Sequence, residues 1–203
     1  MKATPLPSSA APLVDYFNRI MPLTTEETEL VSNKFHSRLY RKKQFLLQEG
    51  DLCNTISFVV KGCLRMYKVD DSGTTHIIQF AIENWWVSDL GSFYKRYPSA
   101  LNIEAIEETV VLQISHDDLL NLYEIAPKFN QIFRVLMENN LVGLQERLLQ
   151  NISTDARVRY ESFLKQYPTI VNRVPNTYIA SFLGITPEFL SRIRNERVSQ
   201  KHP

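Results

Sequence analysis

The chain has 203 residues, of which 44% are hydrophobic and 22% are charged, and its formal net charge is +1. This is the composition of a folded, soluble protein with one large or two modest domains. No stretch approaches about 18 consecutive apolar residues, so we expect no membrane-spanning helix and no membrane partner.

The charge is unevenly distributed along the chain. From Ile152 onward, eight Lys and Arg residues against four Asp and Glu residues give +4, which leaves −3 for the residues before it. A basic C-terminal part on a slightly acidic body indicates a nucleic-acid partner for that part alone.

Cysteine and histidine are too sparse for a metal site. Cys53 and Cys63 lie ten residues apart, with no CxxC spacing and no histidine cluster nearby. This argues against zinc, iron–sulfur and disulfide frameworks, so we expect no metal, no cofactor and reduced thiols in a cytoplasmic protein. A cupin-type enzyme would need two or three converging histidines, whereas the predicted strands hold His76 alone, with His36 and His116 at their edges. We therefore expect no enzymatic activity.

The N-terminal part is predicted to be helical after a short tail. Residues 1–12 are rich in Pro, Ser and Ala and lack the apolar run of a signal peptide, so we expect a flexible tail. Helices are predicted over 13–20 and over 24–35. Thr24 followed by Glu26 and Glu27 is a good start for the second of them.

From about Leu39 the sequence changes to short runs typical of β-strands. Asp70-Asp71-Ser72-Gly73, between two of these runs, has the composition of a hairpin turn. No intervening helix is long enough for parallel crossovers, so we expect a small antiparallel barrel or sandwich. The runs are 44–47, 56–60, 63–69, 75–82, 101–106 and 110–114.

The pattern becomes helical at His116, and one long amphipathic helix follows Pro127 and ends near Asn151. Its apolar stripe, which begins at Phe129 and Ile132, fits either packing on the barrel or a coiled-coil seam with a second copy. We favour the seam, because helix-turn-helix proteins generally bind DNA as two-fold dimers. The expected dimer interface comprises Phe133, Leu136, Met137, Leu141, Leu144 and Leu148.

After a separate helix over 153–167 and a loop over 168–175, the stretch 176–193 is typical of a DNA-reading helix-turn-helix. Gly184 can adopt the positive φ that the tight turn requires. Thr186-Pro187-Glu188 then opens a second helix, since threonine caps, proline suits the first position and glutamate opposes the dipole. The shared inner face consists of Ile179, Ala180, Leu183, Ile185, Leu190 and Ile193.

The outer face of the second helix carries side chains suited to DNA. Arginine reaches guanine, asparagine reaches adenine, and serine and threonine donate to phosphate. The expected contacts are Thr186, Glu188, Phe189, Ser191, Arg192 and Asn195, with Arg194 as a further candidate. An ordinary pair of surface helices shares this pattern. The modest basic charge and the short chain after the second helix leave open an alternative function, a sensor module that binds a ligand or protein without touching DNA.

Four features in a fixed order carry a resemblance to a known family. They are the arm Gly50-Asp51…Gly62, the following Leu64-Arg65-Met66-Tyr67, the long helix, and the stretch around Gly184. From about residue 14 to 197 the sequence resembles the bacterial cyclic-AMP receptor protein / fumarate–nitrate regulator (Crp/Fnr) family. Its short C-terminal tail resembles that of members of a Bacteroidetes-like branch of the family.

The resemblance implies an α+β fold. An antiparallel β-roll sensor domain (a cyclic-nucleotide-binding-like jelly roll) with flanking helices is expected over 13–120, a dimerisation helix over 121–152, and a winged helix-turn-helix over 153–203. It also implies a homodimer on palindromic double-stranded DNA, a small-molecule effector of unknown identity, and contact with RNA polymerase.

One segment departs from the family's cyclic-nucleotide binders. Those proteins start a phosphate-binding segment with Gly-Glu and end it with Arg-Ser or Arg-Thr. Here Asp89 takes the glutamate's place and Ser99 the arginine's. A buried phosphate without a cationic partner is costly, so we expect a degenerate pocket that does not bind cyclic AMP tightly. Its residues are Ser88, Asp89, Leu90, Ser99 and Ala100. The nearby aromatic residues either line a cavity for another effector or fill it, and we favour filling; they are Trp85, Trp86, Phe93, Tyr94 and Tyr97.

Overall fold

The computed structural model describes residues 10–201, and the side chains of 197–201 lie outside this description. Most of the tail predicted over 1–12 therefore lies outside the described residues, and its last two residues begin helix α1 (Ala11–Asn18). The chain forms two compact units: Met1–Lys68 with Gln79–Glu138, and Val69–Ile78 with Asn139–Pro203. Among the described residues, no helix has the length and apolarity to cross a bilayer.

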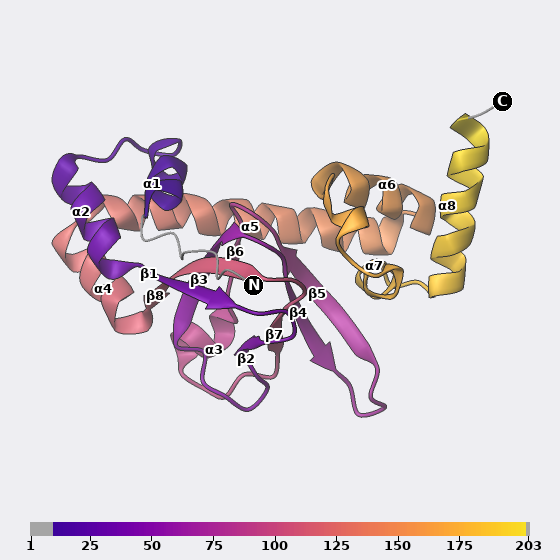
Figure 1. Cartoon of the computed structure of the whole chain (residues 1–203), viewed down its shortest axis with the longest axis horizontal. Coiled ribbons are helices and arrows are strands. Elements are labelled where there is room, and N and C mark those ends of the chain that lie inside the picture. The colour runs from indigo at the N-terminus through magenta and orange to yellow at the C-terminus, as the bar shows by residue number, and fades with distance from the viewer. Residues whose placement is uncertain (1–9, 202–203) are drawn as a thin grey trace, which may run out of the picture. The chain divides into compact units, whose positions relative to one another are not determined.

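Two four-stranded sheets form a β-roll, with strand orders β1-β8-β3-β6 and β2-β7-β4-β5 (Figure 1). The pairings β1–β8, β3–β8 and β4–β7 are antiparallel, which confirms the predicted antiparallel architecture. The strands are β1 (His36–Tyr40), β2 (Phe45–Leu47), β3 (Thr55–Lys61), β4 (Leu64–Val69), β5 (Thr75–Ala81), β6 (Trp86–Val87), β7 (Asn102–Ala105) and β8 (Thr109–Ser115).

Strands β1 and β6 were not predicted from the sequence. β1 alternates between exposed and half-buried residues before the buried Tyr40 and lies at the edge of its sheet, so it lacks a clear apolar run. β6 has only two residues. β8, by contrast, lies between β1 and β3 and is buried along nearly its whole length, and its apolar run made it easy to predict.

The glycines at both ends of the predicted arm have the backbone that only glycine adopts readily. Gly50 has φ +91° and Gly62 has φ +105°. At Gly62 an added Cβ atom would also lie 2.6 Å from the Cα atom of Thr109. At Gly50 an added Cβ atom would have no other atom within 4 Å. The turn after β3 is therefore fixed by both conformation and close packing.

Helices cover one side of the roll in the first unit. α2 (Thr25–Lys34) begins with a capping box, in which Thr24 Oγ1 accepts from Glu27 N at 3.2 Å and Thr24 N donates to Glu27 Oε2 at 2.8 Å. The start predicted at Thr24 is confirmed. The other helices of this unit are α1, α3 (Leu90–Lys95) and α4 (His116–Ile125), and the first part of α5 (Lys128–Ser153) joins them.

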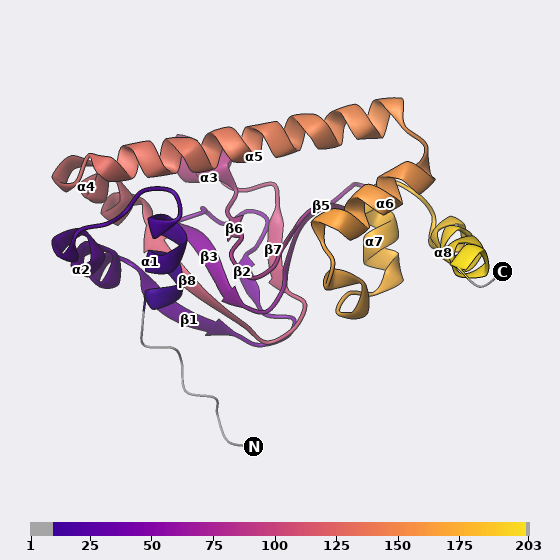
Figure 2. The same cartoon turned by 90° about the horizontal axis from the view of Figure 1, so that it is seen from above.

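An aromatic cluster packs these helices on the roll. The Trp86 ring lies 5.9 Å from Phe17 of α1, 5.2 Å from Phe58 of β3 and 5.6 Å from Phe133 of α5, between ring centroids. Figure 2 shows α1, α2 and α4 beside the N-terminal part of α5. Trp86 thus packs between these helices and the roll, and Phe93 is fully buried, while Tyr94 and Tyr97 are exposed.

The second unit contains the later part of α5 and a helical C-terminal region. α6 (Ala156–Gln166) is capped by Asp155, whose carboxylate accepts from Arg157 N and Val158 N, so the helix predicted after Ser153 is confirmed. The remaining elements are the 3-10 helix η1 (Ile170–Asn172), α7 (Asn176–Leu183) and α8 (Pro187–Lys201). α8 ends at Lys201, the last residue that the structure describes, so the wing implied by the resemblance after this helix lies outside the described residues.

Candidate nucleic-acid interface

The turn at Gly184 joins α7 to α8 (Figure 1). Gly184 has φ 65° and ψ 36°, the left-handed conformation. Ile185 N donates to Ala180 O at 3.0 Å and Gly184 N donates to Ser181 O at 3.1 Å, so the last carbonyls of α7 are satisfied as in a Schellman motif. The turn predicted from the single glycine is present.

A small apolar core fixes the two helices against each other. The predicted inner face is buried at every position except Ile185, which is half-exposed and corrects that part of the prediction. Ala180 is fully buried, and its short side chain allows the close approach that was expected at the helix crossing. Phe182 extends the core toward α6, with its ring centroid 5.5 Å from Phe163 and 5.9 Å from Tyr167.

The six residues predicted to contact DNA are all exposed, and they comprise Thr186, Glu188, Phe189, Ser191, Arg192 and Asn195. Leu190 and Ile193 of the same helix are buried, so α8 has one face in the core and one in solvent. Glu188, Arg192 and Asn195 recur at steps of four and three, which places them on one side of the helix. The geometry meets the first requirement of a recognition helix.

Local contacts orient several of these side chains. Thr186 Oγ1 accepts from Phe189 N at 3.2 Å and so caps α8, while the hydroxyl of Ser191 donates to Pro187 O at 2.9 Å. The guanidinium carbon of Arg192 lies 4.8 Å from the centroid of the Phe189 ring. A cation on an aromatic face is held in place while its N–H groups stay available to a ligand.

Other polar residues fasten α8 to its neighbours. Arg194 donates to the side chain of Asn176 at the start of α7, and Arg157 of α6 forms an ion pair with Glu196. Arg194, considered as a further DNA contact, is half-buried and engaged within the chain.

The segment that corresponds to the family's phosphate-binding segment is held by its own side chains. Asp89 is the N-cap of α3: its carboxylate accepts from Ser92 N at 3.1 Å and from Ser99 Oγ at 2.7 Å. Asp89 and Ser99 are buried, whereas Ala100 is exposed and Leu90 is half-buried. Ser88 Oγ donates to the carbonyl of Thr55 at 3.2 Å. Of the five predicted pocket residues, only Asp89 and Ser99 touch each other through a side-chain hydrogen bond.

A cavity of about 170 Å³ in the roll is framed by a different set of residues. On its wall, Gln113 accepts from Tyr40 Oη at 3.2 Å and donates to Ser57 Oγ at 2.8 Å. Sequence analysis missed this polar group, because Gln113 and Ser57 become neighbours only through the β3–β8 register. Arg38 also lines the cavity and is exposed.

A buried ion pair joins the two central strands of the other sheet. Arg65 of β4 and Glu104 of β7 are register partners, with 2.5 Å between Arg65 Nη2 and Glu104 Oε2, and each side chain is 11% exposed. Tyr67 donates to the same carboxylate oxygen at 3.3 Å. Both charges are thus engaged within the sheet.

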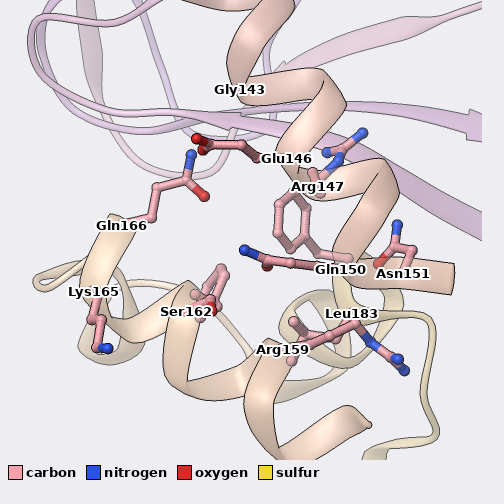
Figure 3. Close-up of a pocket in the computed structure, with 12 residues that line it drawn as sticks. Gly143, Glu146, Arg147, Gln150, Asn151, Arg159, Ser162, Lys165, Gln166 and Leu183 are labelled. Atoms are coloured by element: carbon pink, nitrogen blue, oxygen red, sulfur yellow. The ribbon is translucent and has the colours of Figure 1, made fainter. Parts of the chain in front are cut away.

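The second unit holds a larger cavity of about 370 Å³ between α5, α6 and the end of α7. Figure 3 shows Glu146 and Gln150 of α5 facing Ser162 and Gln166 of α6. Arg147 also lines it, with its guanidinium carbon 5.1 Å from the centroid of the Phe182 ring. Among the described residues, no group of three or more His, Cys, Asp and Glu side chains is arranged to hold a metal ion.

Comparisons with known proteins find matches that cover the roll and most of the chain. The family model for the cyclic nucleotide-binding domain matches residues 37–126. The anaerobic regulatory protein of Pasteurella multocida is 26% identical over 189 residues, which cover 85% of this chain and 68% of the relative. The fumarate and nitrate reduction regulatory protein of Vibrio cholerae is also 26% identical over 189 residues, with 85% and 74% covered. Over most of its length the chain is similar to regulators of the Crp/Fnr family.

Solved structures agree with this Crp/Fnr fold. FixK2 from Bradyrhizobium japonicum superimposes with a TM-score of 0.73 at 20% identity, covering 82% of this chain and 86% of that one. The regulator CLP from Xanthomonas campestris gives 0.70 at 16% identity, covering 88% and 93%. These matches support transcription regulation and DNA binding by a protein of the Crp/Fnr type.

Proposed function

We propose that this Crp/Fnr protein regulates transcription as a homodimer that binds a palindromic DNA site through α8. The observation that carries the proposal is the division of α8 into a buried face, with Leu190 and Ile193, and an exposed face with Arg192 and Asn195. An exposed polar helix positioned by a tight turn is the geometry that enters a major groove.

Dimerisation is supported by the later part of α5, where large apolar side chains lack cover. Leu141, Leu144 and Leu148 are 57%, 47% and 61% exposed. Ile152 continues this face with 75% exposure. Leucines at steps of three and four on a free helix face fit a coiled-coil seam. A two-fold pair would place its two recognition helices about 34 Å apart, on successive turns of DNA.

Not all of the predicted interface is available for this seam. Phe133 is 3% exposed and Leu136 is 8% exposed, because they pack within their own subunit. Met137 is half-buried. The proposed interface is therefore revised to the part of α5 that begins at Leu141.

The effector segment argues against a cyclic nucleotide. In a site that accepts a cyclic phosphate, a cation neutralises the phosphate charge. Here Ser99 occupies that position and already donates to Asp89, whose carboxylate would repel a phosphate. We propose that the protein does not bind cyclic AMP tightly and that any effector has different chemistry.

Genomic selection tests the proposed function. Fragments retained by the purified protein are sequenced for a palindrome, and the Arg192→Ala variant is then footprinted on the selected site. Loss of one base-reading arginine is expected to weaken specific binding by about 1–3 kcal/mol. Arg134→Ala is the control, since Arg134 is 66% exposed on α5 and pairs only locally with Glu138.

The control variant should bind like the wild type, and binding should weaken steeply with salt. If Arg192→Ala footprints like the wild type, the assigned reading face is wrong. If no fragment is retained at low salt, a sensor module that does not bind DNA becomes the better description.

A further inference from the structure

The tip of the β4–β5 hairpin belongs to the same compact unit as the helix-turn-helix. Residues Val69–Ile78 group with Asn139–Pro203, although β4 and β5 themselves belong to the sheets of the roll. This hairpin is the turn that the sequence predicted at Asp70-Asp71-Ser72-Gly73, and the proposed DNA-binding function gives it no role.

A single serine fastens the hairpin to the first helix of the helix-turn-helix. Ser181 Oγ donates to the carbonyl of Thr75 at 2.7 Å and accepts from Ile77 N at 3.1 Å. β5 is the last strand of its sheet, so backbone groups on its outer edge have no neighbouring strand. One hydroxyl can donate and accept at once, so Ser181 takes the place of that strand.

Arg147 of α5 provides a second attachment next to the first. Its guanidinium donates to the carbonyl of Ile78 and also lies over the ring of Phe182, the residue after Ser181. Burial lowers the pKa of Arg147, yet an arginine stays charged in a protein. The charge-assisted bond therefore supports the hairpin where Ser181 holds it.

The hairpin covers the outer face of α7. At about 100° per residue, Ser181 lies on the side of α7 opposite to the buried Ile179 and Leu183. In helix-turn-helix proteins the first helix crosses the DNA backbone. The hairpin therefore lies on α7, the helix that DNA phosphates would approach.

The charge of the hairpin is unfavourable for DNA. Val69–Ile78 contains two carboxylates, Asp70 and Asp71, and no Lys or Arg, and His76 Nε2 lies 2.6 Å from Asp70 Oδ2. The Asp70 carboxylate accepts from Ser72 N at 2.9 Å and from Thr74 N at 2.9 Å. Hydrogen bonds from the turn, first of all from the Ser72 side chain, lower the pKa of Asp70, so it remains ionised. Carboxylates on the hairpin that Ser181 holds would repel incoming phosphates.

We propose that the β4–β5 hairpin is an autoinhibitory latch that holds the helix-turn-helix through Ser181 and must be released when DNA binds. This inference rests on the proposed DNA-binding function. Because the latch favours the free protein, each interaction that holds it lowers the affinity for DNA.

The Ser181→Ala variant tests the latch in the full-length protein. Removal of the hydroxyl breaks both bonds to β5, and DNA affinity is expected to rise by about threefold to tenfold. Ser162→Ala is the matched control. It also removes one serine hydroxyl, but Ser162 lies on α6 and lines the cavity of Figure 3, away from the bonds that Ser181 makes. Its affinity should equal that of the wild type.

The outcomes separate the latch from the function on which it rests. Equal or lower affinity of Ser181→Ala, with normal DNA binding by the wild type, overturns the latch alone. Absence of DNA binding by the wild type and both variants overturns the latch together with the proposed function.

Hydrogen exchange gives a readout that a general change in affinity would not move. Amides of 69–78 are expected to exchange faster in Ser181→Ala than in the wild type, and faster in the DNA-bound wild type than in the free protein. If DNA leaves these amides as protected as before, the hairpin is not released and the proposal is wrong.

Discussion

At the scale of single residues, one ion pair joins helix α2 to helix α4. Lys34 at the end of α2 lies 2.8 Å from the carboxylate of Asp118 in the first turn of α4. Asp118 also accepts from Ser115 Oγ at 2.7 Å. The hydrogen bond from Lys34, and then the one from Ser115, lower the pKa of Asp118.

This lowered pKa predicts how stability depends on pH. A carboxyl with a lower pKa in the folded chain stabilises the fold above its unfolded pKa of about 3.9, and the contribution is lost as the pH falls through the folded pKa. We expect Asp118→Asn to lower the free energy of unfolding at pH 7 by less than about 1 kcal/mol, since the pair is partly open to water. Urea unfolding at several pH values measures this, and the difference from the wild type should shrink below pH ~4.

The adjacent residue supplies the control for this titration. Asp117 is 99% exposed in the same helical turn, so Asp117→Asn keeps the ion pair with Lys34. Equal losses in the two variants, or a loss for Asp118→Asn that persists at pH 3, would show that the ion pair is not the cause.

At the scale of elements, the turn between α7 and α8 depends on a backbone conformation. A Cβ atom at Gly184 would meet no other atom within 4 Å, so the positive φ is the only obstacle to a side chain. We expect Gly184→Ala to destabilise the protein by about 1 kcal/mol. Gly143 inside α5 also has open space for a Cβ atom, and there the helical backbone suits alanine.

Thermal or urea unfolding compares the two glycine variants. Gly143→Ala should raise the free energy of unfolding by roughly 0.5–1 kcal/mol, since glycine is a poor helix former. Opposite signs for the two substitutions support the conformational explanation. A stability loss of the same size in both variants would point instead to a general intolerance of added side chains.

The turn and α5 show how far sequence patterns can be read. The turn was predictable, because Gly184 and the start signal at Thr186 act locally. α5 was predictable as a helix but not in its packing. Its buried residues from Phe129 to Leu136 and its exposed leucines from Leu141 onward follow the same three- and four-residue steps. The centre of the stripe turns by roughly 100° around the helix between the two sets, at about 100° per residue.

The long-range polar contacts had no sequence signal at all. Arg65 meets Glu104, and Ser181 meets the edge of β5, only because the chain brings residues far apart in sequence together. The exposed face of α8 was predictable residue by residue, because helical periodicity decides which side chains turn away from a known core. The hydrogen bond from Ser99 to Asp89 was not predictable, since composition does not say which polar groups pair.

At the scale of the whole molecule, the sequence joins a sensor-like roll to a DNA-binding region through one helix that also carries the proposed seam. A single recognition helix contacts few base pairs, so specific binding needs the second copy and its half-site. Dimerisation and DNA affinity should therefore fail together when the seam is disrupted.

Leu148→Glu tests this coupling, because Leu148 is 61% exposed in the middle of the proposed seam. A charge at this position must be desolvated in the dimer, so we expect monomers in sedimentation experiments at micromolar concentration and at least a tenfold loss of affinity for the palindrome. Asn139→Glu is the control, since Asn139 is exposed and lies on the side of α5 opposite to Leu148 at about 100° per residue, and it should remain dimeric. A monomeric wild type, or a Leu148→Glu variant that stays dimeric, would place the two-fold contact outside this helix face.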